Sequence, residues 1–223
     1  LAPLFAAVAL LIKIVSPGPV FFTQTRVGRF GKTFQFYKFR TMHHNNDDSV
    51  HASYLKELIH SDEDDEKPML KIQNDNRIIP FGNVLRKSCI DELPQLFNVL
   101  KGEMSLVGPR PCIPYEAKEY LRWHARRFDV IPGMTGRWQV NGKNKTTFKE
   151  MIRLDIQYAL NATLWSDLAI LFKTPFAILS QAMEKPGTAE KTEQKEVKEK
   201  AEKPKRNMTV SGSMNQKLAA NIS

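Results

Sequence analysis

The first fifteen residues constrain the fold more than any other stretch of this chain. They are almost wholly apolar, which predicts a helix, but a helix needs about 20 such residues to cross a bilayer. The segment also lacks the basic start and the cleavage site of a signal peptide. Ser16-Pro17-Gly18-Pro19 follows directly, and its two prolines predict that the helix ends there. One interpretation is a buried core helix that is closed by a turn.

The basic excess limits the class of partner. The net charge is +9 and the isoelectric point is about 9.5, which suits nucleic acid, a membrane surface or a phosphorylated substrate. Neither zinc-finger spacing nor an RNA-binding aromatic signature occurs in the sequence, so we predict no nucleic-acid partner. The two cysteines, Cys89 and Cys112, form no CxxC motif or disulfide framework, which is consistent with a reducing compartment.

Hydrophobic periodicity predicts an α+β fold that is mainly helical. Residues 20–42 alternate apolar and polar side chains, and Gly28 and Gly31 predict a turn between two short strands. Residues 138–140 (Trp-Gln-Val) are predicted to form another short strand. The helical patterns cover residues 53–59, 116–128, 148–160 and 164–181, the last as a helix pair or a helix kinked at Pro175.

The chain divides into three parts by composition. Residues 1–19 form the apolar segment and its turn, and residues 20–183 have the length and the apolar content of one domain. From Glu184 to the end Lys and Glu dominate. Such a segment buries too little apolar surface to offset its ordering entropy, so we predict that residues 184–223 are disordered.

Asp91 and Glu92 stand side by side just ahead of Pro94 and form the strongest candidate for a reactive site. Ser88 can cap a helix with Asp91 in a capping box, or Pro94 can be the first helical residue. In both cases the two carboxylates lie at a helix N-terminus, which favours anions. Neighbouring side chains point in different directions, so one carboxylate can bind a cation while the other attacks a phosphorus atom. The plainer alternative is that both decorate the first turn of a surface helix.

Three stretches of the chain, taken together and in order, resemble the bacterial sugar transferase family, the monotopic polyprenyl-phosphate phosphoglycosyl transferases. They are residues 16–42, from Ser16-Pro17-Gly18-Pro19 to Tyr37-Lys38-Phe39-Arg40-Thr41-Met42, residues 86–100 around the carboxylates, and residues 132–140. The resemblance extends from about residue 1 to about residue 179. It implies a monotopic membrane protein whose re-entrant helix enters one leaflet and returns to the cytoplasmic face of the bacterial inner membrane. In that family a Ser-Pro pair bends the membrane helix, and here Ser16 and Pro17 form such a pair at the end of the apolar segment.

The same resemblance implies transfer of a sugar-1-phosphate from a UDP-sugar to a polyprenyl phosphate, with release of UMP. Asp91 would be the nucleophile, and Glu92 would bind Mg²⁺, a hard cation that prefers oxygen ligands. Arg86 would add positive charge, and together with Arg77 it would keep Asp91 ionised. The residues expected to bind substrate are Lys38, Arg40, Arg77, Pro109, Arg110 and Pro111. Two alternatives remain open, a membrane-bound metal-dependent phosphohydrolase that uses the same carboxylates and a catalytically inert basic membrane scaffold.

Overall fold

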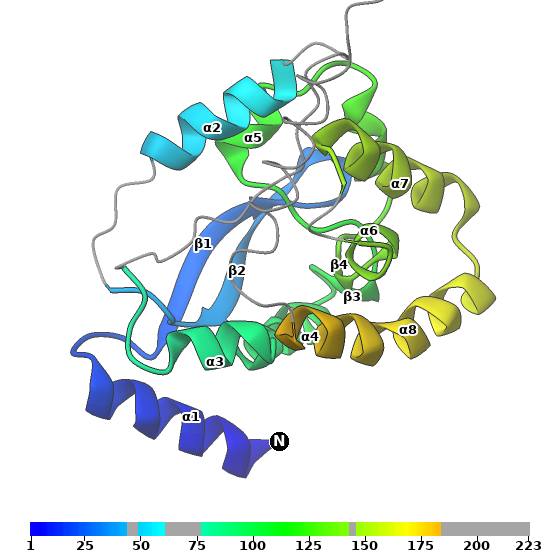
Figure 1. The fold of residues 1–223 in the computed structure, drawn as a ribbon. Coiled ribbons are helices and arrows are strands. Elements are labelled where there is room, and N and C mark those ends of the chain that lie inside the picture. Colours follow the sequence, from blue (N-terminus) through cyan, green and yellow to red (C-terminus); the bar gives the residue numbers. More distant parts are fainter. Residues whose placement is uncertain (44–48, 61–76, 143–145, 184–223) are drawn as a thin grey trace, which may run out of the picture. The chain divides into compact units, whose positions relative to one another are not determined.

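The computed structural model describes residues 1–43, 49–60, 77–142 and 146–183, and its fold is α+β and mainly helical, as predicted (Figure 1). The first half comprises α1 (Ala2–Val15), β1 (Phe21–Val27), the 3₁₀ helix η1 (Arg29–Gly31), β2 (Thr33–Phe39), α2 (Ser49–His60), α3 (Gly82–Lys87), the 3₁₀ helix η3 (Ile90–Gln95) and α4 (Leu96–Leu100). The second half comprises β3 (Ser105–Val107), α5 (Pro114–Lys118), the 3₁₀ helix η4 (His124–Asp129), β4 (Gly133–Thr135), α6 (Arg137–Val140), α7 (Phe148–Asn161) and α8 (Leu164–Met183). The segment predicted to be a disordered tail lies outside the described residues.

Strands β1 and β2 form an antiparallel hairpin in which Phe21 pairs with Phe39 and Val27 pairs with Thr33. The prediction of two short strands over residues 20–42 is therefore confirmed. Between the strands, η1 reverses the chain with positive φ at Gly31 (76°) and also at Phe30 (56°). A phenylalanine seldom adopts this left-handed conformation, and here the guanidinium of Arg29 stacks on its ring at 4.5 Å.

Helix α1 is helical as predicted, but only one of its faces packs against the protein. Val8 and Ile12 are buried in a cluster with Phe39 of β2 and Leu85 of α3. The opposite face is exposed, with Leu10 63% and Ile14 74% accessible. The interpretation as a fully buried core helix is therefore wrong for half of the helix. Among the described residues, no helix combines the length and the apolar character that crossing a bilayer requires.

The turn after α1 is held by a buried arginine that the sequence assigned to substrate binding. The guanidinium of Arg40 donates from Nη1 to Ser16 Oγ (3.0 Å) and to the Pro17 carbonyl (2.9 Å), and from Nη2 to the Ser16 carbonyl (2.8 Å). Arg40 is only 4% exposed and Ser16 only 1%. This arginine therefore fixes the direction in which α1 leaves the hairpin.

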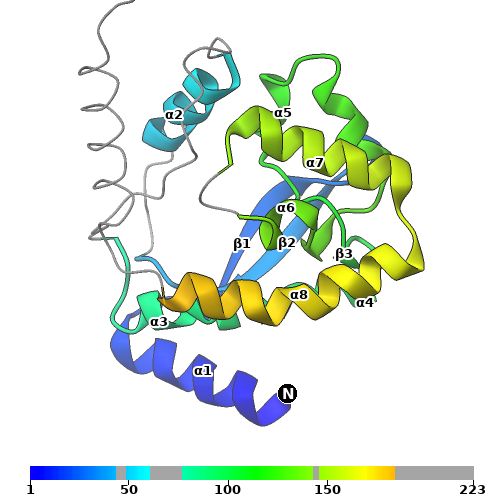
Figure 2. The same cartoon turned by 45° about the vertical axis from the view of Figure 1, so that its right-hand side comes forward.

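Strands β3 and β4 pair in parallel, with Ser105 opposite Gly133 and Val107 opposite Thr135. Helix α8 packs against this pair and also contacts α6 and α3. In both views α1, α3 and α8 lie at the same end of the hairpin (Figures 1 and 2). Tyr158 of α7 and Ile170 of α8 form a small core with Val107.

Two predicted elements differ from the structure. Residues 138–140 lie in the short helix α6 instead of a strand, because Gly136 starts a turn in which Val140 N bonds the Gly136 carbonyl (3.3 Å). The helix predicted over residues 116–128 is divided into α5 and η4, because the ring nitrogen Nδ1 of His124 accepts from Leu121 N (3.1 Å) and replaces a helical carbonyl. Helix α8 confirms the helix predicted over residues 164–181 and runs through Pro175 as a single helix, which excludes the alternative of a helix pair.

Helix α7 was predicted almost to its ends and offers a simple test of local stability. The hydroxyl of Thr147, its N-cap, accepts from Glu150 N at 3.2 Å. Replacing Thr147 with Ala leaves that donor without its cap, so we expect the free energy of unfolding to fall by about 1 kcal/mol. Chemical denaturation would measure this change, and Thr147→Ser should restore most of it. Equal stability of the Ala and Thr forms would contradict the capping role.

Candidate active site

Asp91 and Glu92 lie in the first turn of the 3₁₀ helix η3. Neither of the two predicted helix starts, a Ser88 cap or Pro94 as the first helical residue, is found in the structure. The hydroxyl of Ser88 donates back to the Val84 carbonyl (2.8 Å) at the end of α3 instead of capping the next helix, and Pro94 lies inside η3. Cys89, with a φ of 55°, makes the turn between α3 and η3. The prediction that both carboxylates lie at a helix N-terminus is confirmed.

Asn98 holds this region against the hairpin. Its side chain is completely buried, and its Nδ2 donates to the Gln35 carbonyl (2.6 Å) and to Glu103 Oε2 (2.7 Å), while its Oδ1 accepts from Tyr37 N (3.2 Å). Two of these bonds go to the backbone of β2, so α4 and the preceding η3 are fixed along that strand. As a result, Lys38 is placed beside the carboxylates.

Two cationic side chains converge on Glu92. Lys38 Nζ lies 2.9 Å from Glu92 Oε1 and 3.8 Å from Asp91 Oδ2. Arg110 Nη1 donates to the same Glu92 oxygen at 3.2 Å. The side chains of Lys38 and Glu92 are each 17% exposed, and that of Asp91 is 7% exposed. The side chains of this cluster are therefore largely desolvated but not fully buried. Because of this desolvation, their charges interact more strongly than they would in bulk water.

Burial and charge have opposite effects on Asp91. Desolvation raises the pKa of its carboxyl group above the ordinary value, and the neighbouring Glu92 charge adds to this effect. The pKa of Asp91 is lowered most by Lys38, then by Arg110 and by Arg86. Arg86 was predicted, together with Arg77, to keep Asp91 ionised; the charge of Arg86 does lower this pKa, but the charges of Lys38 and Arg110 lower it more, and burial still raises the net value. Arg86 lies on the exposed side of α3, and its charge still reaches Asp91.

The turn Pro109-Arg110-Pro111 is anchored through its backbone. Its three carbonyls accept, in order, from Gly133 N (2.9 Å), Arg127 Nη2 (2.8 Å) and Arg26 Nη1 (3.1 Å). Arg127 is buried and Arg26 is half-buried in this network, and desolvation is the main reason why the pKa of Arg26 falls to about 10. The side chain of Arg110 extends from this fixed backbone to Glu92. The sequence did not identify the residues that hold this turn, and its contact with a substrate remains a prediction.

The other residues predicted to bind substrate have different surroundings. Arg40 binds the turn after α1, so the structure does not bring its guanidinium to the carboxylates. Arg77 follows an undescribed segment, and its carbonyl accepts from His43 N at 2.7 Å. Their contact with a substrate remains a prediction.

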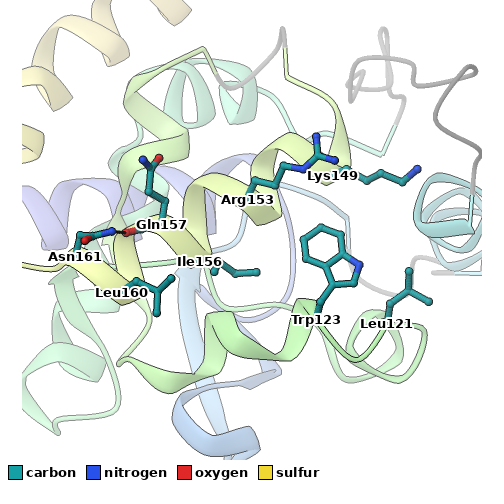
Figure 3. Close-up of a pocket in the computed structure, with 8 residues that line it drawn as sticks. All are labelled: Leu121, Trp123, Lys149, Arg153, Ile156, Gln157, Leu160 and Asn161. Atoms are coloured by element: carbon teal, nitrogen blue, oxygen red, sulfur yellow. Dashed lines mark hydrogen bonds between the residues drawn. The ribbon is translucent and has the colours of Figure 1, made fainter.

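A separate hollow of about 630 Å³ lies beside α7 (Figure 3). Its lining joins an indole and apolar side chains to two cationic and two amide side chains: Leu121, Trp123, Lys149, Arg153, Ile156, Gln157, Leu160 and Asn161. No residue of this hollow belongs to the predicted site. The cluster around Asp91 therefore remains the candidate active site.

Several residues of the site had no distinctive sequence signal. Asn98 lies in an apolar helical pattern, where a polar residue at a buried position is the only local sign of a role. Arg127 and Asp155 lie in different elements, 28 residues apart, and nothing in their local spacing links them. Hydrophobic periodicity could have placed each of these charged residues on the buried face of its helix. Two buried charges of opposite sign could then have been expected to pair.

Two carboxylates and two cations meet in one partly desolvated cluster, an arrangement typical of functional sites. A family model described as bacterial sugar transferase matches residues 1–181, and the chain belongs to this family. The chain is 45% identical to the undecaprenyl-phosphate galactose phosphotransferase of Salmonella typhimurium, over 73% of this chain and 34% of that protein. It is 44% identical to the galactosyl transferase CpsE of Streptococcus agalactiae, over 73% and 35% of the two chains. It is also 39% identical to the exopolysaccharide production protein ExoY of Rhizobium meliloti, over 81% and 79%. The sequence thus spans about a third of the first two relatives and most of the third.

Loss of Lys38 should change the pH dependence of this site. Lys38 lowers the pKa of Asp91 more than any other charge, so in Lys38→Met protein that pKa should rise further. If Asp91 acts as a nucleophile, as the resemblance implies, it does so as its carboxylate, so the acid limb of the pH–activity profile should move to higher pH, and kcat/KM should fall roughly a hundredfold.

The matched control for that experiment is Lys101→Met. Lys101 is exposed at the end of α4, and its ammonium donates to Tyr37 Oη of β2 (3.1 Å). This variant removes a lysine bound to the same strand and should leave the acid limb where it is. If both variants moved the limb equally, the effect of Lys38 on Asp91 would be refuted.

Proposed function

We propose that this protein transfers a sugar-1-phosphate from a UDP-sugar to a polyprenyl phosphate, and so makes a polyprenyl-diphosphate-sugar and UMP. The observation that carries the proposal is the contact of Asp91 and Glu92 with Lys38 and Arg110 in one site. The names of several relatives point the same way, including a UDP-galactose-lipid carrier transferase of Erwinia amylovora and a UDP-glucose:undecaprenyl-phosphate glucose-1-phosphate transferase of Xanthomonas campestris. Relatives named for exopolysaccharide production suggest that the reaction starts a surface polysaccharide.

In the first step, Asp91 attacks the β-phosphorus of the UDP-sugar. A bond forms between a carboxylate oxygen and that phosphorus, the bond to the bridging oxygen breaks, and UMP leaves with the electron pair. In the second step, an oxygen of the lipid phosphate attacks the same phosphorus and releases the Asp91 carboxylate. Such covalent catalysis divides one difficult transfer into two. The second carboxylate, Glu92, has a different role in this scheme. It contacts Lys38 and Arg110 rather than attacking the phosphorus.

Lys38 and Arg110 are suited to bind the diphosphate. In this structure both side chains pair with the Glu92 carboxylate. When substrate binds, each can donate to a phosphate oxygen while it stays in the cluster. Arg110 can donate two parallel bonds to such an oxyanion, and Lys38 supplies a compact charge. Cations fixed where the leaving group gains charge favour its departure.

The donor atoms of the site agree with a Mg²⁺ ion. Among the described residues no cluster of three or more acidic, His or Cys side chains occurs, but Mg²⁺ is commonly held by one or two carboxylates together with substrate phosphates. Glu92, with Asp91 beside it, offers such hard oxygens. When bound, the ion would neutralise charge on the diphosphate.

We further propose that the protein binds the cytoplasmic face of the inner membrane through one end of the fold. Exposed apolar residues gather on α1, α3, α4 and α8, which contact one another or lie close together. They include Leu10, Ile14, Phe81, Val84, Leu100, Trp165, Phe172, Phe176 and Leu179. Exposed apolar surface of this extent marks an interaction site, and the basic net charge suits anionic lipids.

Incubation with a panel of UDP-sugars, polyprenyl phosphate and Mg²⁺ tests the catalytic proposal. We expect release of UMP together with transfer of the labelled sugar into the organic phase. Sugar phosphate that stays in the aqueous phase would instead identify a phosphohydrolase, in which water replaces the lipid. Lipid binding without nucleotide turnover would identify an inert membrane scaffold.

Flotation with anionic lipid vesicles tests the membrane proposal separately. Wild-type protein should float, and Phe172→Ser together with Phe176→Ser should reduce the floating fraction. A matched pair of substitutions in the hollow beside α7, Leu121→Ser and Leu160→Ser, should have little effect. Flotation that depended equally on both pairs would contradict the assignment of this face.

A further inference from the structure

Arg127 is a buried cation outside the cluster of charges described above. Its side chain is 2% exposed, and its Nη2 atom donates to Asp155 Oδ2 (2.5 Å) and to the carbonyl of Arg110 (2.8 Å). Its Nη1 atom donates to the hydroxyl of Tyr120. One guanidinium thus joins η4, α7 and the turn that carries Arg110.

The partners of Arg127 are themselves fixed. Asp155 is 1% exposed, and its pKa rises to about 6 because burial outweighs the charge of Arg127. The Tyr120 hydroxyl donates to Glu116 Oε1 at 2.5 Å. A buried ion pair of this kind is weak evidence for stability, since desolvation offsets most of its Coulomb energy. Its bond to the Arg110 carbonyl therefore suggests another reason for its presence.

We propose that Asp155 and Arg127 are positioning residues that fix the guanidinium of Arg110 at Glu92 through the backbone of Arg110. The inference rests on the proposed function, in which Arg110 binds the diphosphate. Arg127 holds the carbonyl of Arg110, and Arg26 holds the next carbonyl. The backbone is thereby fixed at the residue whose side chain enters the site.

Small shifts of this turn have large consequences for catalysis. A displacement of about 1 Å can cost roughly a hundredfold in rate, because bound groups must keep a near-attack geometry. Asp155 orients Arg127, and without the aspartate charge the guanidinium is expected to move away from the Arg110 carbonyl. Asp155 is 45 residues from Arg110 in the sequence, and Arg127 links the two through its hydrogen bonds to the Asp155 carboxylate and the Arg110 carbonyl.

A double-mutant cycle between Asp155 and Arg110 tests the inference. Asp155→Asn keeps the size of the side chain and removes its charge, and it is made alone and together with Arg110→Ala. In protein with Arg110 we expect Asp155→Asn to lower kcat/KM for UMP release by about tenfold or more. In Arg110→Ala protein the same change should cost less than about twofold, because the group that it positions is gone.

A general structural role predicts a different result. If Asp155→Asn caused the same fold-loss with and without Arg110, the positioning role would be overturned. Thr147→Ala is the stability control on the same helix, since the bond that it removes is the N-cap hydrogen bond from Glu150 N. Its kcat/KM should stay within about twofold of wild type at a temperature where both remain folded.

A second variant and a second measurement keep the test decisive. If Asp155→Asn protein does not fold, Tyr120→Phe, which removes one partner of Arg127, replaces it in the same cycle. Calorimetric affinity for a UDP-sugar is measured on all four proteins as well. Wild-type protein that binds UDP-sugar without releasing UMP would refute the proposed function, and the binding cycle would then decide the positioning role. Wild-type protein that neither binds nor turns over UDP-sugar would overturn both.

Discussion

Replacing Asp91 with Asn should reduce turnover about a thousandfold or more, the largest effect on activity that we expect. An amide keeps the shape of the side chain but is a very poor nucleophile. Wild-type protein that receives UDP-sugar without lipid should gain the mass of one sugar phosphate and release one UMP per active site. The Asp91→Asn protein should do neither. Quenched-flow assays and intact-protein mass spectrometry measure both quantities.

Two further variants separate the nucleophile from its surroundings. Glu92→Gln should also reduce turnover strongly, and added Mg²⁺ should restore part of it if Glu92 binds the ion. Asp129→Asn, an exposed aspartate whose backbone carbonyl rather than its side chain binds Arg29, should have normal activity. Near-normal turnover of Asp91→Asn protein would show that Asp91 is not the nucleophile. UMP that appears only when lipid is present, with no adduct, would indicate direct transfer.

Replacing Gly133 with Ala should lower the free energy of unfolding by about 3 kcal/mol or more, the largest effect on stability that we expect. A Cβ at Gly133 would lie 2.0 Å from Gly108 N and 2.5 Å from the Val107 carbonyl carbon. These atoms belong to the backbone of the β3 region, so they cannot rotate away as the end of a side chain can. The strand must move, and the turn at Arg110 moves with it. Chemical denaturation gives the stability, and UMP release gives the activity.

The same substitution at Gly102 is the matched control. Gly102 has a φ of 75° and no atom within 4 Å of an added Cβ, so alanine there meets only backbone strain of about 1 kcal/mol. Activity should persist in Gly102→Ala protein because the site is not displaced. If both variants lost the same stability, the close approach of Gly133 to Gly108 would not be the cause.

Local patterns in the sequence were sufficient for several elements. The apolar run predicted α1, alternation with two glycines predicted the hairpin, and helical periodicity predicted α7 almost to the residue. Such patterns show which residues, a few positions apart in the sequence, lie on the same face of a helix or strand. They suffice for these elements because interactions between residues close in sequence determine them. The pattern failed at residues 138–140 and at residues 116–128, where turns and buried side chains compete with regular backbone hydrogen bonds.

The two basic residues of the Lys38-Phe39-Arg40 run illustrate what the sequence leaves open. Both were predicted to bind substrate, and they are separated by one residue. In the structure Lys38 contacts Glu92, whereas Arg40 binds the turn after α1. The choice depends on which segments pack at the end of β2, and no local pattern contains that information.

By itself the sequence determined that two adjacent carboxylates lie at a helix start and that a rigid Pro-Arg-Pro turn follows them. The tertiary structure alone decided which charges meet them. Lys38 and Arg110 reach Glu92 across 54 and 18 residues, and Arg127 reaches Asp155 across 28. Such contacts form only after Asn98, the β3–β4 pair and the buried faces of η4 and α7 have brought distant segments together. The chain contains many charged residues of similar local sequence, and packing determines which of them form these contacts. Burial of an unpaired charge costs free energy, so the charges that become buried are those that form a pair.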